Sequence, residues 1–156
     1  MFKAFRAIGV CLIFVILLDA SAMQADKFIT HLNSPQTQKL GLPFSEAVKV
    51  GNALYLSGQI GVKPGTTKLV EGGLLEESRQ TMENIKNTLE TFGYSLSDVV
   101  KCTVMLADIG QWKTFNRVYL EFFNPPFPAR SAFGANGLAL GAKVEIECIA
   151  AKNDNK

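Results

Sequence analysis

The segment from residue 144 to residue 151 constrains the fold more than any other part of the chain. Its residues alternate between apolar and acidic types, so Glu145 and Glu147 point to one face of a strand and the apolar residues between them point to the other. One face therefore belongs to a hydrophobic core, and the other carries carboxylates. A chain with such a strand must build a sheet that is covered on one face.

Arg130 is the only charged residue between Glu121 and Lys143. A guanidinium group can hold a carboxylate with two parallel hydrogen bonds, and Glu145 can position a water molecule or accept a proton. The two residues make a minimal site for metal-free chemistry on a small carboxylic acid. The spacing is equally compatible with a structural Arg–Glu ion pair, and it does not distinguish the two interpretations.

The other elements follow from hydrophobic periodicity. Residues 44–50 and 53–62 are expected to be strands joined by a tight turn at Gly51-Asn52, and Gly58 inside the second strand indicates a bulge or a close backbone approach. Pro35 argues against a helix in residues 26–42, which we interpret as a short strand or arm leading into a loop.

Two helices are predicted. The first spans about residues 75–92, with Glu77 and Arg79 on its solvated face. A strand at residues 99–107 follows, and Asp108 is expected to cap the second helix. With the segment around Arg130 as a further strand, the chain is predicted to form an α+β fold. It has a mostly antiparallel sheet with two helices on one face. The open acidic face favours a homo-oligomer.

Residues 1–22 have the order of a secretory signal peptide. A basic start is followed by an apolar run at residues 7–18 and by Ala20-Ser21-Ala22, which matches an A-x-A cleavage site. The apolar run is shorter than the roughly 20 residues that a membrane span needs. We expect one domain at residues 23–156, exported to the periplasm or secreted, with no membrane association after cleavage. An unused signal would leave the protein in the cytoplasm.

Composition excludes several classes of site. The formal net charge is only +2, so no nucleic-acid partner is expected. Cys102 and Cys148 lie inside predicted strands without the spacing of a metal site, and free buried thiols are favoured over a disulfide. His31 is the single histidine and is interpreted as a surface residue.

Several motifs, in a common order, span nearly all of the chain after residue 22. They are Phe44-Ser-Glu-Ala-Val48, Leu56-Ser-Gly-Gln-Ile60, Asn84-Ile85, Val99-Val-Lys-Cys-Thr-Val104, Asn116-Arg-Val-Tyr-Leu-Glu-Phe-Phe123, Pro128-Ala-Arg-Ser131 and Val144-Glu-Ile-Glu-Cys-Ile-Ala150. Together they resemble the reactive intermediate deaminase family, RidA/YjgF, also called endoribonuclease L-PSP. The resemblance implies a chorismate-mutase-like fold and a homotrimer with sites between subunits. It also implies hydrolysis of reactive 2-enamine or 2-imino acids to 2-keto acids and ammonia, without a cofactor.

The same resemblance assigns roles to individual residues. Arg130 matches the arginine that holds the substrate carboxylate, and Glu145 matches the acid near the attacking water. Ser57 and Gly58 match a substrate-contacting pair, and Asn116 matches a polar residue near the cleft. The substrate-binding set also includes Phe44.

The chain departs from the family pattern at several positions, and Leu138-Ala-Leu-Gly141 replaces the family's Leu-Pro-containing turn. Phe44 replaces a tyrosine and lacks its hydroxyl, and Ala132 replaces a cysteine found in several members. The departures and the export signal support an alternative function, an exported protein that binds or scavenges small carboxylates without turnover. A ribonuclease has little physical support, because the chain has neither a basic groove nor a second histidine.

Overall fold

The computed structural model describes residues 28–153, so the predicted signal peptide lies outside the described residues. A seven-stranded sheet has the order β1-β2-β3-β7-β5-β6, and β4 also pairs with β7. The strands are β1 (Ile29–Leu32), β2 (Ala47–Val50), β3 (Ala53–Leu56), β4 (Gln59–Ile60), β5 (Val99–Leu106), β6 (Ala129–Gly134) and β7 (Val144–Ala151). Within this sheet only β5 and β6 run parallel. The predicted α+β fold with a mostly antiparallel sheet is confirmed.

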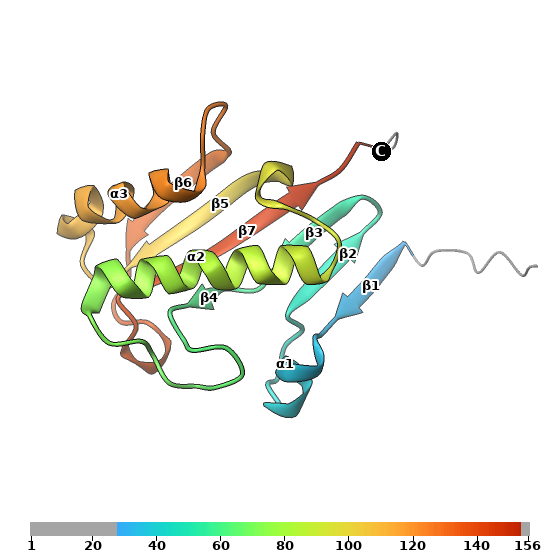
Figure 1. The fold of residues 1–156 in the computed structure, drawn as a ribbon, viewed down its shortest axis with the longest axis horizontal. Helices are drawn as coiled ribbons and strands as arrows, with labels where there is room; N and C mark the ends of the chain where they lie inside the picture. The colour runs from blue at the N-terminus through green and yellow to red at the C-terminus, as the bar shows by residue number, and fades with distance from the viewer. Residues whose placement is uncertain (1–27, 154–156) are drawn as a thin grey trace, which may run out of the picture.

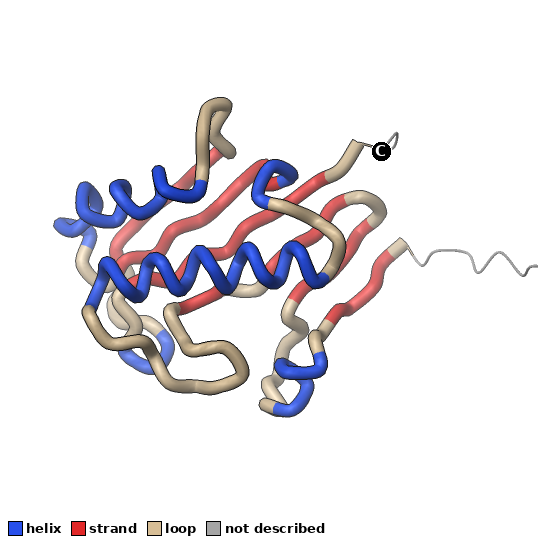
Figure 2. The backbone as a smooth tube through the Cα atoms, in the orientation of Figure 1, coloured by secondary structure: helices blue, strands red, loops and turns tan. Residues whose placement is uncertain are grey.

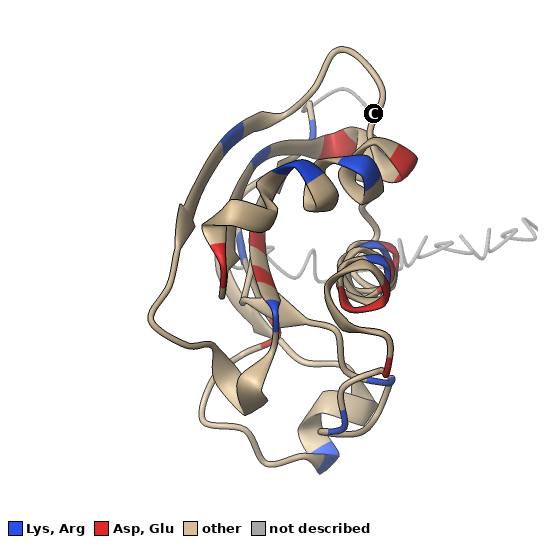
Figure 3. Ribbon diagram, turned by 90° about the vertical axis from the view of Figure 1, so that its left-hand side faces the viewer, with Lys and Arg blue, Asp and Glu red and all other residues tan. Residues whose placement is uncertain are grey.

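The two predicted helices are α2 (Gly73–Thr91) and α3 (Trp112–Phe122). Seen edge-on, the sheet curves around these helices, which lie on its concave side (Figure 3). The core between them includes Met82, Ile85 and Phe115 from the helices and Val104 and Ile146 from the sheet, all fully buried. The core face of β7 is thus the one that the alternating sequence predicted.

Residues 26–42 were expected to form a short strand or arm leading into a loop, and β1 confirms the strand, but a short helix, α1 (Pro35–Lys39), follows it and corrects the expectation that no helix forms there. Proline disrupts a helix interior, but at the first helical position its missing N–H is one that would lack an intrahelical partner anyway. The Ser34 side chain accepts a hydrogen bond from the Thr37 N–H and caps the helix. Pro35 therefore starts this helix.

Glu77 is a second correction, because it lies on the buried side of α2 with only 5% of its surface exposed. Its Oε2 atom accepts the Lys143 N–H at 2.7 Å. The backbone at Gly61 explains how α2 comes so close to the sheet: a Cβ on this glycine would lie 2.7 Å from the Glu77 Cα. The hydrogen bond ties α2 to the start of β7.

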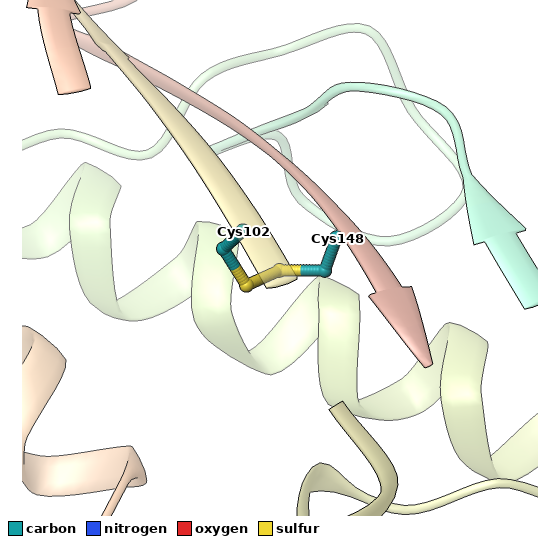
Figure 4. The surroundings of a disulfide bond; sticks show 2 residues. All are labelled: Cys102 and Cys148. Atoms are coloured by element: carbon teal, nitrogen blue, oxygen red, sulfur yellow. A yellow bond between two sulfur atoms is a disulfide. The ribbon is translucent and has the colours of Figure 1, made fainter. Parts of the chain in front are cut away.

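The cysteines are a third correction. Cys102 of β5 and Cys148 of β7 are direct cross-strand partners and form a disulfide on the core face (Figure 4). Both residues are essentially fully buried. The sequence left open whether these strands are neighbours, and their adjacency at this register is what allows the bond.

Candidate functional site

The sharpest feature of the site is the contact between Gly58 and Glu145. The expected second strand is interrupted after Leu56 and resumes at Gln59, and Gly58 lies in the interruption. A Cβ built on Gly58 would lie 2.1 Å from Glu145 Oε1, so a side chain at position 58 would displace the carboxylate. The predicted close backbone approach is confirmed.

Glu145 and Gly58 line a cleft with a volume of about 740 Å³. Phe44 also lines it, so the structure brings together three of the residues predicted from the sequence. Figure 2 shows α1 and the loop between β4 and α2 at the same end of the molecule, and residues from both form other parts of the wall. Ser57 is not among the lining residues. Its hydroxyl donates to the Ser45 carbonyl at 2.7 Å.

Glu145 has an environment suited to proton transfer. Partial burial raises the pKa of its carboxyl above the ordinary glutamate range, and the negative charge of Glu147 on the same strand face raises it further. A carboxylate with a raised pKa is a stronger base and becomes a usable acid nearer neutral pH.

Glu46 is a functional candidate that sequence reasoning missed. Its carboxylate accepts the Ser34 N–H at 2.8 Å and the Thr88 hydroxyl at 3.1 Å, and its own N–H donates to Asn33 Oδ1 at 2.8 Å. Burial alone raises the pKa of Glu46, but the hydrogen bonds outweigh it and the net shift is downward. Glu46 thus anchors the segment that carries Phe44. An acidic residue between Phe44 and the buried Ala47 was the available signal.

Arg130 lies on the edge strand β6, which is separated from β7 by β5. Its guanidinium carbon is 4.4 Å from the ring centroids of both Trp112 and Tyr119 on α3, a cation–π arrangement. Burial raises the pKa of Tyr119, and the nearby Arg130 charge opposes that shift. Among the described residues, the guanidinium stacks on aromatic rings and forms no ion pair with Glu145.

Asn116 belongs to this Arg130 region. It precedes Tyr119 by three positions, which places both side chains on one side of α3. Asn116 Oδ1 and the Tyr119 hydroxyl are buried without a hydrogen-bond partner among the described residues. Unpaired buried polar atoms are unusual in folded proteins, and one of these two belongs to Tyr119, whose ring lies against the guanidinium.

The two predicted catalytic residues therefore do not meet within one chain. Arg130 is paired in register with Cys102 and points toward the helices. Glu145 is paired with Met105, which is three positions after Cys102 on β5. Side chains alternate between the two faces along a strand, so Glu145 points to the face opposite Arg130. This arrangement excludes an Arg130–Glu145 ion pair within one chain. A structural Arg–Glu pair across a subunit interface, which the sequence also allowed, is not tested by the arrangement of one chain.

Two further properties concern residues 28–153 only. No helix there has the length and apolar character to cross a bilayer. These residues also contain no cluster of three or more His, Cys, Asp or Glu side chains arranged to hold a metal ion. Lys and Arg are distributed over several elements (Figure 3).

Known proteins are similar to this chain in both sequence and fold. The family model described as Endoribonuclease L-PSP matches residues 36–152. The human protein named 2-iminobutanoate/2-iminopropanoate deaminase is 43% identical over 108 residues, which cover 69% of this chain and 79% of the human protein. The yeast protein HMF1 is 47% identical over 111 residues, covering 71% and 85% of the two chains.

Solved structures agree. RidA from an Antarctic Psychrobacter species has a TM-score of 0.69 and 37% identity, with 81% of this chain and all of that chain covered. The YjgF gene product of E. coli has a TM-score of 0.67 and 36% identity, with 71% and 89% covered. The chain therefore belongs to the endoribonuclease L-PSP family, which includes RidA and YjgF, as its motifs predicted.

Proposed function

We propose that this chain hydrolyses 2-imino acids, and the enamines in equilibrium with them, to 2-keto acids and ammonia. The observation that carries the proposal is the Glu145 carboxyl, which lines the cleft against Gly58 with a raised pKa. Relatives with 43% or greater identity named as deaminases of 2-iminobutanoate and 2-iminopropanoate support it.

The chemistry needs one water molecule and one proton carrier. The Glu145 carboxylate accepts a proton from water as the water oxygen bonds to the imine carbon. That proton then passes to the nitrogen, which gives a carbinolamine. Glu145 next takes the proton of the new hydroxyl and delivers it to the nitrogen, the C–N bond breaks, and ammonia leaves as the keto group forms. The scheme needs no metal or organic cofactor, because the imine carbon is already electrophilic.

Arg130 supplies the anchor for the substrate carboxylate in this proposal. Because Arg130 and Glu145 point to opposite faces of the sheet, Arg130 would act on a cleft that contains Glu145 of a neighbouring subunit. A homotrimer with a site at each interface satisfies this requirement, and the open acidic face of β7 offers a surface for it. Asn116, with its unpaired oxygen, would lie on the same side of that interface as Arg130.

We further propose that the domain acts after export. The buried Cys102–Cys148 disulfide supports this location, because disulfides form and persist in oxidising compartments. Mass spectrometry of the protein from its native host tests the proposal: a mature chain that begins at Met23 is expected, and an intact Met1 would contradict it.

Binding without turnover is the second candidate function. It is favoured by Phe44, which lines the cleft but brings no hydroxyl for proton transfer. A coupled assay separates the two functions. An amino-acid oxidase generates a defined imine, and the release of keto acid is followed with and without the protein. Acceleration that is lost in Glu145→Gln supports hydrolysis, whereas saturable binding without acceleration supports the alternative.

A further inference from the structure

The guanidinium of Arg130 lies against a row of aromatic rings from a single helix. Its central carbon is 4.4 Å from the ring centroids of Trp112 and Tyr119 and 6.0 Å from that of Phe115. The three rings come from α3, whereas Arg130 comes from β6. All of these contacts are made within one chain, so they do not require a neighbouring subunit.

These contacts leave the hydrogen-bond donors of Arg130 unused. Among the described residues, no hydrogen bond or ion pair involves its guanidinium. Arg79 of α2 shows the opposite case, because its Nε and both terminal nitrogens donate to the carboxylates of Glu121 and Glu76. An aromatic ring contacts the flat face of a guanidinium, whereas the N–H groups point outward in its plane. Arg130 is therefore held without spending the donors that a ligand carboxylate needs.

The ring of Tyr119, rather than its hydroxyl, makes the contact with Arg130. Tyr119 is only 4% exposed, and its hydroxyl is buried without a partner among the described residues. The ring packs between Phe115 and Phe123, at centroid distances of 5.8 and 4.7 Å. Aromatic packing thus fixes this ring, and the fixed ring in turn restricts the guanidinium beside it.

We propose that Trp112 and Tyr119 are positioning residues for the substrate carboxylate. Their rings hold the Arg130 guanidinium in one place before the substrate arrives, with its N–H groups free to bind. Ordering a long side chain during binding would otherwise cost about threefold to tenfold in affinity. The inference rests on the proposed function, since it adds two residues to the same site.

The test measures KM and kcat for the imine that an amino-acid oxidase generates from alanine. Trp112→Leu and Tyr119→Leu remove a ring but keep an apolar side chain, and each should raise KM by about threefold to tenfold. The kcat value should change by less than about twofold, because the carboxylate is held equally in the ground and transition states. Trp112→Phe and Tyr119→Phe keep a ring, so their KM should stay within about twofold of the unchanged protein.

Tyr94→Leu is a matched control. Tyr94 is 7% exposed, and its ring lies 5.0 Å from the Lys152 ammonium group, so it is also a buried tyrosine in a cation–π contact. Its hydroxyl donates to the Asn52 carbonyl at the turn between β2 and β3, away from Arg130. Tyr94→Leu should lower the thermal stability as Tyr119→Leu does, but it should leave KM unchanged. Equal KM values in these two variants would show that the Tyr119 ring has only a structural role.

A second measurement does not depend on turnover. Calorimetric titration with pyruvate should show that Trp112→Leu lowers the affinity by the same factor as it raises KM. Trp112 is only partly buried, so Trp112→Leu should fold and can decide the test even if Tyr119→Leu does not.

The possible failures are distinguishable. A folded Trp112→Leu variant with unchanged KM and unchanged pyruvate affinity would overturn the positioning role while leaving imine hydrolysis in place. An equal loss in Trp112→Phe and Trp112→Leu would overturn it as well, because the phenylalanine retains a ring. No acceleration by the unchanged protein would overturn the proposed function, and the pyruvate titrations would still test whether the rings position Arg130.

Discussion

At the scale of single residues, Arg130 is held by aromatic rings rather than by an acidic partner. Its guanidinium lies 4.4 Å from the centroid of Trp112, the only tryptophan in the sequence. A ligand carboxylate that binds Arg130 changes the charge and position of a group in contact with the indole. The fluorescence of Trp112 therefore reports directly on occupancy of the predicted carboxylate anchor.

We predict that titration with pyruvate, a 2-keto acid product, changes the tryptophan fluorescence in a saturable way. Arg130→Lys should abolish most of this change and most imine hydrolysis, because an ammonium group cannot reproduce the planar two-donor fork. Thermal stability should change little, since the loss is limited to a cation–π contact at a partly exposed site. Arg117→Lys, an exposed arginine on α3, should behave like the unchanged protein. An undiminished titration in Arg130→Lys would contradict the anchor.

Glu145 gives a prediction about pH. Its pKa is raised by burial and, to a lesser degree, by Glu147, so activity that needs the carboxylate is lost as the pH falls through that raised pKa. Glu147→Gln removes the like charge and should shift the acid limb of the kcat/KM profile to lower pH. Glu71→Gln, on the exposed loop before α2, should leave the limb in place. A limb that does not move in Glu147→Gln would show that the titrating group is not Glu145.

Some residue-level features could be predicted from the sequence and others could not. A glycine inside a strand pattern indicates close backbone approach, and Gly58 follows that rule. Glu77 was assigned to solvent because charged residues on an amphipathic helix are normally exposed. Its burial depends on the Lys143 N–H, which is 66 positions away in the sequence. The sequence around Glu77 cannot indicate a hydrogen-bond donor that far away.

At the scale of elements, the disulfide joins the two central strands β5 and β7. The cross-link closes a loop between positions 46 residues apart, which restricts the unfolded chain. We predict that the double variant Cys102→Ala with Cys148→Ala has a free energy of unfolding lower by about 2 to 4 kcal/mol. Denaturant titration measures this difference.

The control for the disulfide prediction is the unchanged protein, unfolded with and without a reductant, which should show a decrease of similar size. Imine hydrolysis by the folded double variant should persist, because both sulfur atoms lie on the helix-covered face and Glu145 lies on the other. Equal stability of the oxidised and reduced chains would contradict the cross-link.

Helices and strands whose apolar residues recur at regular spacing could be predicted from the sequence. Features that depend on caps or on contacts between distant residues could not. Helices α2 and α3 and strands β5 and β7 follow directly from apolar spacing. The short α1 depends on the Ser34 cap and on Pro35 at the first helical position. It was missed because proline was taken to exclude a helix in this segment. The pairing of Cys102 with Cys148 requires strand order and register, which apolar spacing does not contain.

At the scale of the whole molecule, the opposite orientation of Arg130 and Glu145 predicts a shared site. Arg130→Ala and Glu145→Gln should each be inactive alone. When the two variants are unfolded together and refolded as mixed oligomers, some interfaces combine an intact Arg130 with an intact Glu145. In a cyclic trimer mixed at equal amounts, about a quarter of the interfaces should be intact, so a comparable fraction of the activity should return.

Light scattering on the domain should give three times the monomer mass under the conditions of that assay. Separately refolded variants, combined without unfolding, control for slow exchange of subunits. A site contained in one chain would give no recovery in the mixed oligomers, and a monomeric but active protein would contradict the shared site altogether.

The contact between Gly58 and Glu145 has a genetic consequence. Any codon change that adds a side chain at position 58 pushes the carboxylate out of place, since even a Cβ would lie 2.1 Å from Glu145 Oε1. A residue with no chemistry of its own is thus expected to affect activity through the position of the acid it faces. Missense alleles at codon 58 should therefore lower the activity that depends on Glu145 while leaving the acid itself in the sequence.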